Sequence, residues 1–213
     1  MPVVRRLLLA TALTALSVGG GVAAVSGDES SDEPAATSTP LASYDTSRVT
    51  ILRTGFCDWV ADEAVSAALE AEPEGAEAYA NGDRVRLAAR IRDRAHEHGC
   101  SWTAEGATAA AWVFAPPVTR ATAGRLLRQA RAERGCEPVP DAPAYGAPSA
   151  GLVCTTSGSL EVSFRGLFGD AWLVCSIASD DVPAGQSHSS TIDRAGRWCV
   201  AVAEAARAVP EAG

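Results

Sequence analysis

Residues 152–177 decide the fold of this chain; they read LVCTTSGSLEVSFRGLFGDAWLVCSI. Within them Leu160, Val162 and Phe164 alternate with polar residues, which is the period of a strand with one solvent-exposed face. Short apolar runs lie on either side, separated from this strand by glycine-containing turns. The stretch therefore predicts three short strands, at 152–156, 160–165 and 171–177.

Two more strands are predicted upstream as a hairpin over 100–115. Cys100 and Trp102 lie two positions apart on one strand face, and a turn at Glu105-Gly106 leads into a second run of alternating small and apolar residues. Residues 76–99 fit a strand and a helix equally well, with a preference for strand near their end.

Three helices complete the pattern. One is predicted over about 58–71 with Asp62 as its cap, one from Thr119 or Thr122 to about Gly135, and one beginning at Ser190 or Thr191. The order αββαβββα predicts an α+β fold, an antiparallel sheet with helices packed on one face.

The N-terminus has the pattern of an export signal. Arg5 and Arg6 precede an uncharged run over 7–25, which predicts a cleaved signal peptide or, alternatively, an N-terminal membrane anchor over 1–25. Residues 26–47 are rich in Ser, Pro, Asp and Glu and predict a disordered acidic tether. A single folded domain is then expected over 48–213.

The chain has six cysteines, all after the predicted signal, at Cys57, Cys100, Cys136, Cys154, Cys175 and Cys199. An even number in an exported chain indicates disulfides, and six cysteines allow 15 connectivities. Pairing of neighbours along the chain would join a helix to a strand in each case, which favours that connectivity without fixing it. No Cys-x-x-Cys pair is present to indicate a zinc, redox or haem site.

Composition excludes several functions. All 18 basic residues are Arg, so Schiff-base, Walker A and Ser-x-x-Lys chemistries have no lysine to use. A net charge of −8 argues against nucleic acid as a partner, since phosphate binding needs a basic surface. Neither a cofactor nor a metal is predicted.

Four motifs together resemble a known family. Cys57-Asp58-Trp59-Val60, Cys100-Ser101-Trp102, Gly135-Cys136 and Tyr145-Gly146 resemble an exported actinobacterial cell-envelope domain of unknown function. That domain is similar to the extracellular sensor domain of mycobacterial receptor-type serine/threonine kinases. The resemblance implies an envelope location and a ligand-binding or sensing role, with no catalytic residues. This chain lacks the lipid-attachment cysteine and the kinase domain of such proteins.

Two histidine motifs suggest chemistry, and each also has a simpler explanation. His96, His98 and Cys100 have the spacing of a metal site, but a disulfide at Cys100 would remove the thiol. His188 lies among serines, at 187–190, without the Gly-x-Ser-x-Gly turn of a serine hydrolase, so a loop with a helix cap is the simpler interpretation.

The charged residues cluster. Seven acidic residues occur over 58–77, and five arginines follow over 84–94; internal pairing or solvation explains them more simply than an anion site. The same holds for Arg125, Arg128, Arg131 and Arg134 on the second predicted helix.

Leu167 and Phe168 form the candidate interaction site. Large apolar residues in a hairpin turn either fold back onto the core or form an exposed anchor for a partner.

The sequence thus predicts a non-enzymatic binding or sensing module at the outer face of the cytoplasmic membrane or secreted, with an unknown envelope ligand or protein as partner. The alternatives are a secreted hydrolase using His188 or His96, and a structural protein-interaction domain.

Overall fold

A computed structural model describes residues 39–88, 91–156, 158–180 and 188–207, which belong to one compact unit of the chain, Pro34–Gly213. The predicted signal or anchor at 1–25 and most of the predicted tether lie outside the described residues. Among the described helices, none has the length and hydropathy that would be needed to cross a bilayer.

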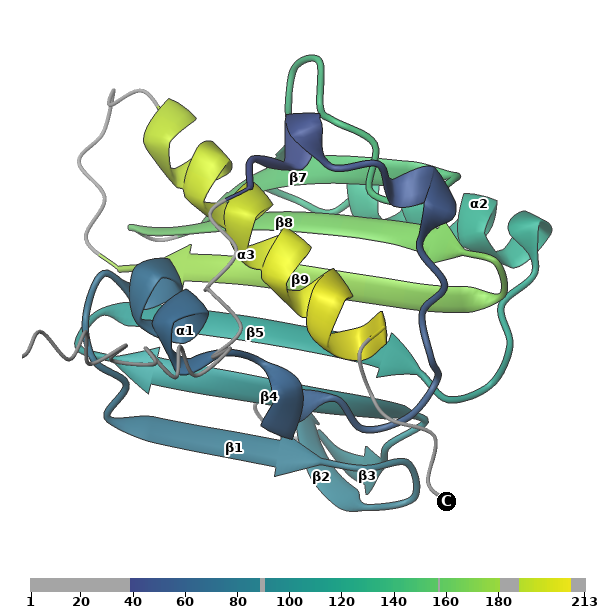
Figure 1. Ribbon diagram of the computed structural model, residues 1–213, viewed down its shortest axis with the longest axis horizontal. Coiled ribbons are helices and arrows are strands. Elements are labelled where there is room, and N and C mark those ends of the chain that lie inside the picture. Colours follow the sequence, from purple (N-terminus) through teal and green to yellow (C-terminus); the bar gives the residue numbers. More distant parts are fainter. Residues whose placement is uncertain (1–38, 89–90, 157, 181–187, 208–213) are drawn as a thin grey trace, which may run out of the picture. The chain divides into compact units, whose positions relative to one another are not determined.

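The centre of the fold is a seven-stranded antiparallel sheet in the order β1-β4-β5-β9-β8-β7-β6 (Figure 1). Its strands are β1 (Gly75–Tyr79), β4 (Glu97–Ala104), β5 (Ala107–Phe114), β6 (Cys136–Pro138), β7 (Ser149–Thr156), β8 (Ser159–Phe168) and β9 (Ala171–Ser179). A separate hairpin joins β2 (Arg84–Ala88) to β3 (Ile91–Arg94). The α+β class and the antiparallel sheet are as predicted.

The predicted strands are all present, and the stated element order is incomplete. β7, β8 and β9 occupy the three strands expected over 152–177, and β4 and β5 form the expected hairpin around Glu105-Gly106. The stretch 76–99, which the sequence left open between strand and helix, contains the strands β2 and β3 and all of β1 except Gly75, and the structure adds β6. Among the described residues, five strands rather than two therefore lie between the first two α-helices. β1 escapes pattern recognition because it is an edge strand whose residues are mostly exposed, which removes the alternation.

The α-helices are α1 (Asp62–Leu69), α2 (Arg120–Arg131) and α3 (Ser189–Arg207), with short 3₁₀ turns at η1 (Leu41–Ser43), η2 (Thr46–Arg48) and η3 (Cys57–Trp59). Thr119 caps α2 as expected, its Oγ1 accepting from the N–H of Thr122 at 3.2 Å. The helix predicted over 58–71 is shorter, since η3 precedes it and Asp62 is its first residue rather than its cap.

The helices cover both faces of the sheet, which corrects the prediction of one covered face (Figure 1). α1 and α3 pack on one side, the α1/α3 face, over Ala109, Ala111 and Leu173. On the opposite side, the α2 face, Ala123 and Leu127 of α2 pack in one cluster with apolar side chains of β7, β8 and β9. The central strands carry apolar side chains on both faces, so each face needs a cover.

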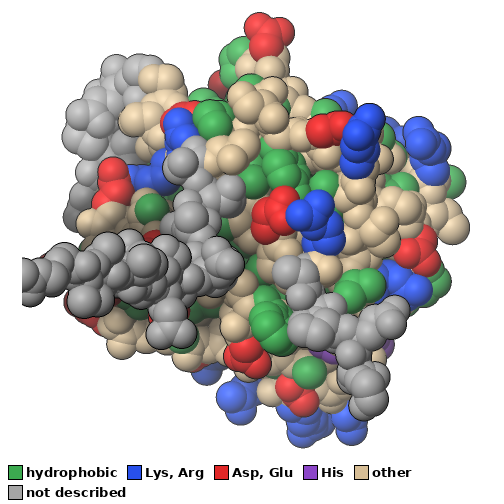
Figure 2. All heavy atoms as spheres, viewed as in Figure 1, with side chains coloured by type: hydrophobic (Ala, Val, Ile, Leu, Met, Phe, Trp, Pro, Cys, Tyr) green, Lys and Arg blue, Asp and Glu red, His purple; other side chains and the backbone are tan. Residues whose placement is uncertain are grey.

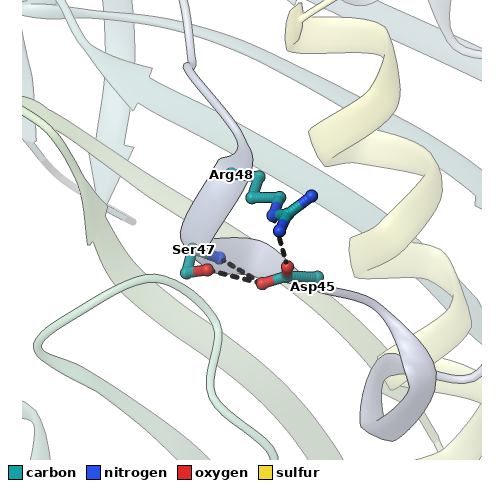
Figure 3. Close-up of polar contacts among 3 residues, drawn as sticks. All are labelled: Asp45, Ser47 and Arg48. Carbon is teal, nitrogen blue, oxygen red and sulfur yellow. Dashed lines mark hydrogen bonds and ion pairs between the residues drawn. The ribbon is translucent and has the colours of Figure 1, made fainter.

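The folded unit also begins earlier than predicted. Leu41 of η1 is buried in the core against α3, and the Tyr44 hydroxyl donates to Glu204 Oε1 of α3 at 2.5 Å. Asp45 caps η2: its carboxylate accepts hydrogen bonds from the Ser47 N–H and hydroxyl and pairs with Arg48 (Figure 3). The tether boundary predicted at Ser47 is therefore too late, because scattered apolar residues in this segment pack on α3 without a periodic pattern.

Three disulfides join neighbouring cysteines along the chain: Cys57 with Cys100, Cys136 with Cys154, and Cys175 with Cys199. The first ties η3 to β4, the second pairs β6 with β7, and the third fixes α3 to β9. This is the connectivity favoured from the predicted elements. Disulfides of this number are typical of oxidising, extracytoplasmic compartments.

Candidate functional site: a cleft between α2 and the sheet

A cleft of about 430 Å³ lies where α2 meets the sheet. Its lining comes from β5, β8, β9, α2 and the two residues that follow α2: Trp112, Phe114, Leu126, Gln129, Ala130, Ala132, Glu133, Arg165, Trp172 and Val174. Strand alternation places Trp112 and Phe114 together on one face of β5, and Trp172 and Val174 together on β9. The cleft therefore has aromatic and aliphatic walls, and Gln129, Glu133 and Arg165 supply its polar side chains.

Arg165 is the cationic group of the cleft. The register aligns Trp112 with Val174 and Val174 with Arg165, so these three side chains form a row across β5, β9 and β8. The guanidinium donates from Nη2 to Ser163 Oγ at 2.8 Å, while its buried Nε–H has no hydrogen-bond partner among the described residues. Burial lowers the pKa of Arg165, and the carboxylates of Glu161 and Glu133 act against that shift.

Two carboxylates lie near Arg165 without forming an ion pair with it in the described part of the chain. Burial raises the pKa of Glu161 and Arg165 acts in the opposite direction, whereas Glu133 lies at the exposed rim. A buried donor without a partner is costly, so a ligand whose acceptor reaches the Arg165 guanidinium would bind with a gain in free energy.

The chemistry that this lining offers is binding. Trp112 and Trp172 can contact a flat apolar group, and Arg165 can donate to a carboxylate or another acceptor. None of the cleft's lining residues is a serine, cysteine or histidine. No group of three or more His, Cys, Asp or Glu side chains with metal-site geometry occurs within the described residues.

The residues proposed from sequence, Leu167 and Phe168, are buried at 5% and 3% exposure. They point to opposite faces of the sheet: Leu167 packs in the α2 cluster and Phe168 in the α1/α3 cluster, edge-on to Tyr145 at 5.0 Å between ring centroids. Of the two interpretations, the structure shows packing in the core, and no exposed anchor is formed here. Both residues also line a second cavity of about 590 Å³ beside η2 and the start of α2.

The structure does not assemble the proposed histidine sites. Cys100 is bonded to Cys57, so its thiol cannot join His96 and His98 in a metal site. Burial lowers the pKa of His98, and Asp83 opposes that shift. His188 immediately precedes α3, and none of the three histidines pairs with a described carboxylate; the neighbouring Ser187 lies outside the described residues.

Sequence reasoning missed Trp112, Phe114 and Arg165. It assigned Ala111 and Val113 to the inward face of a strand, and that assignment is confirmed, but the opposite face of the same strand carries two aromatic residues. Aromatic side chains on the supposedly solvent-exposed face were the available signal that this face is also covered.

The sequence matches no protein-family model, and no curated protein matches it significantly. Function must therefore be inferred from the geometry of the cleft and from the sequence itself. The resemblance to an exported envelope domain remains a proposal.

Proposed function

We propose that this protein is an exported binding or sensing module of the bacterial cell envelope that holds a small ligand in the cleft between α2 and the sheet. The observation that carries the proposal is the aromatic cleft with Arg165, whose buried Nε–H has no partner among the described residues. The uncharged run after Arg5 and Arg6 and the three disulfides support an extracytoplasmic location.

The lining specifies a ligand class. Trp112, Phe114 and Trp172 favour a flat apolar body, and Arg165 favours a carboxylate, which accepts strong charge-assisted hydrogen bonds. An aromatic or polyunsaturated carboxylic acid combines both features. Partial burial makes the cleft a better environment for this pair than the exposed arginines of α2, where solvent competes.

Ligand-observed NMR and calorimetry with 2-naphthoate and its neutral isostere 2-naphthamide test this function. We expect 2-naphthoate to bind more tightly than the amide, and Arg165→Met to remove most of that preference while keeping the aliphatic stem. The matched control is Arg125→Met, an exposed arginine of α2 that is not part of the lining. Leu126→Trp, which fills the cleft, should abolish binding of both compounds.

Binding that survives both Arg165→Met and Leu126→Trp would contradict the proposal, as would the absence of binding to the unsubstituted protein. A screen of esters, amides and glycosides tests the hydrolase alternative. Turnover that His188→Ala or His96→Ala abolishes, in a variant that melts normally, would favour that alternative.

A further inference from the structure

We infer that the β2–β3 hairpin and the edge strand β1 form a second binding site, which takes an acidic oligosaccharide through a cluster of arginines. This site lies at the β1 end of the sheet, whereas α2 packs on β6, β7 and β8 at the other end. The lining of this second site and that of the cleft under α2 have no residue in common, so the inference is independent of that cleft.

The hairpin register brings four arginines onto one face. Arg84 lies opposite Arg94 and Arg86 lies opposite Arg92, and residues directly opposite in an antiparallel pair share a face. Positions two apart along each strand also share that face. All four side chains are exposed, so the hairpin presents a compact set of arginines whose Cβ atoms lie about 5 Å apart across the strands and about 7 Å apart along them.

The positive charges of these four arginines are not neutralised by ion pairs within the described part of the chain. Like charges directly opposite each other destabilise a strand pair. None of the four arginines forms an ion pair with a described carboxylate, and Arg94 Nη1 donates to the Gly82 carbonyl oxygen at 2.8 Å. Basic side chains gather at the part of the surface where Figure 1 shows β2 and β3, on a chain whose net charge is −8 (Figure 2). The sequence suggested internal pairing or solvation for these arginines, and the described residues form no ion pair with them.

A groove of about 910 Å³ lies between this arginine face and β1. Its lining consists of Arg84, Val85, Arg86 and Arg92 from the hairpin and Ala76, Glu77, Ala78, Tyr79 and Ser101 from the sheet. Tyr79 is held in place because its hydroxyl donates to Glu97 Oε1 at 2.7 Å and its ring lies over Gly99, where a Cβ would come within 2.5 Å of it. The groove thus combines three arginine side chains with the Glu77 carboxylate, the Ser101 hydroxyl and the Tyr79 ring.

These groups match a carboxylated sugar chain. The planar guanidinium group of arginine binds carboxylates in bidentate geometry. The Glu77 carboxylate can accept hydrogen bonds from sugar hydroxyls, and the Ser101 hydroxyl can donate or accept them. Glu77 in the same groove repels anions in general, and it disfavours a densely charged phosphate more than a sugar chain with one charge per residue. Nucleic acid fits poorly, because its affinity depends on many phosphate contacts and the rest of this chain is acidic.

Isothermal titration calorimetry with tetragalacturonate tests the inference, with its fully methyl-esterified form as the neutral control. We expect the acid to bind and the ester not to bind. The triple substitution Arg84→Gln, Arg86→Gln and Arg92→Gln should weaken binding by about tenfold or more, because each charge-assisted contact contributes substantially. Removing three exposed arginines of α2 (Arg125→Gln, Arg128→Gln and Arg131→Gln) changes the net charge equally and should alter the affinity less than about twofold. If the triple variant melts early, Arg86→Gln alone should still weaken binding.

Several results would overturn the inference. The first is equal binding of acid and ester, and the second is an equal loss in the α2 variant, which would indicate a general charge effect. The third is tighter, arginine-dependent binding of tripolyphosphate or of phosphatidylglycerol vesicles, which would make this a phosphate or membrane site. The last is no binding of tetragalacturonate at millimolar concentration.

Discussion

The Tyr145 hydroxyl donates a hydrogen bond of 3.1 Å to the carbonyl oxygen of Cys199, which lies 54 residues later in α3. Tyr145 is fully buried, and its ring packs edge-on against Phe168 at the end of β8. One side chain thus joins the loop before β7, the end of β8 and the centre of α3. Because Cys199 is bonded to Cys175, this contact and a disulfide fix the same helical turn to the sheet.

Tyr145→Phe should lower the free energy of unfolding by about 1 to 1.5 kcal/mol, the usual net value of a buried hydrogen bond. The ring and its contact with Phe168 are retained, so the packing of the core should not change. Urea denaturation measures the loss. Tyr44→Phe, at a half-buried tyrosine, is the comparison and should cost less; equal losses would contradict the special role of Tyr145.

All three tyrosines should resist ionisation near pH 10. Burial, the largest cause in each case, raises the pKa of Tyr145, Tyr44 and Tyr79, and hydrogen bonds to Glu204 and Glu97 add to the shift of the last two. In the unfolded chain these phenols ionise at about pH 10. The stability they contribute is complete below that pH and decreases above it, because the unfolded state loses protons that the folded state keeps.

Absorbance at 295 nm during an alkaline titration measures this behaviour. Tyrosinate should appear together with the loss of tertiary structure, in one cooperative step above pH 10. A phenol that ionises near pH 10 while the near-ultraviolet circular dichroism stays native would contradict the burial of at least one tyrosine.

Leu167→Ala and Phe168→Ala should each destabilise the fold by about 2 to 5 kcal/mol, the range for truncating a large buried side chain. The coupling energy between the two changes should be smaller than either single loss, because the side chains pack in separate clusters on opposite faces of the sheet and share only the cavity beside η2. Urea unfolding of both single variants and the double variant gives the coupling. A large coupling energy would show that these neighbours share one packing environment, contrary to the structure.

Thiol titration of the unfolded, unreduced protein should find no free cysteine, as all six are paired.

Replacing Cys136 and Cys154 by alanine should lower the free energy of unfolding by about 3 kcal/mol on the chain-entropy model. Replacing Cys175 and Cys199 should cost more, since both are fully buried between α3 and the sheet and their loss also leaves a cavity. Thermal melts of the two double variants give the ranking, and the reverse order would contradict it.

The local patterns were enough to predict the antiparallel sheet's central strands. Leu160, Val162 and Phe164 alternate and are all buried on the α1/α3 face, as a period of two requires. The edge strand Gly75–Tyr79 could not be predicted in the same way, because an exposed strand has no apolar face to mark it.

The candidate site was harder to predict than the fold. Large apolar residues are unusual in turns, which distinguishes Leu167 and Phe168 in the sequence, yet both side chains are buried in the core. Arg165 looked like an ordinary residue on the polar face of a strand. Its place in the cleft depends on Trp112, which lies 53 positions earlier in the chain. The two residues share a row across the sheet only because β9 pairs with both β5 and β8.

The sequence by itself determined the disulfide-braced α+β class and the exclusion of lysine chemistry, and it predicts an export signal at the N-terminus, because these follow from composition and from periods of a few residues. Tertiary structure alone decided that α2 covers the second face of the sheet, that Arg165 lies in an aromatic cleft, and that four arginines share one face of a hairpin. Those outcomes depend on strand register and on the pairing of distant segments. A shift of one residue in register would turn the same side chains to the opposite face.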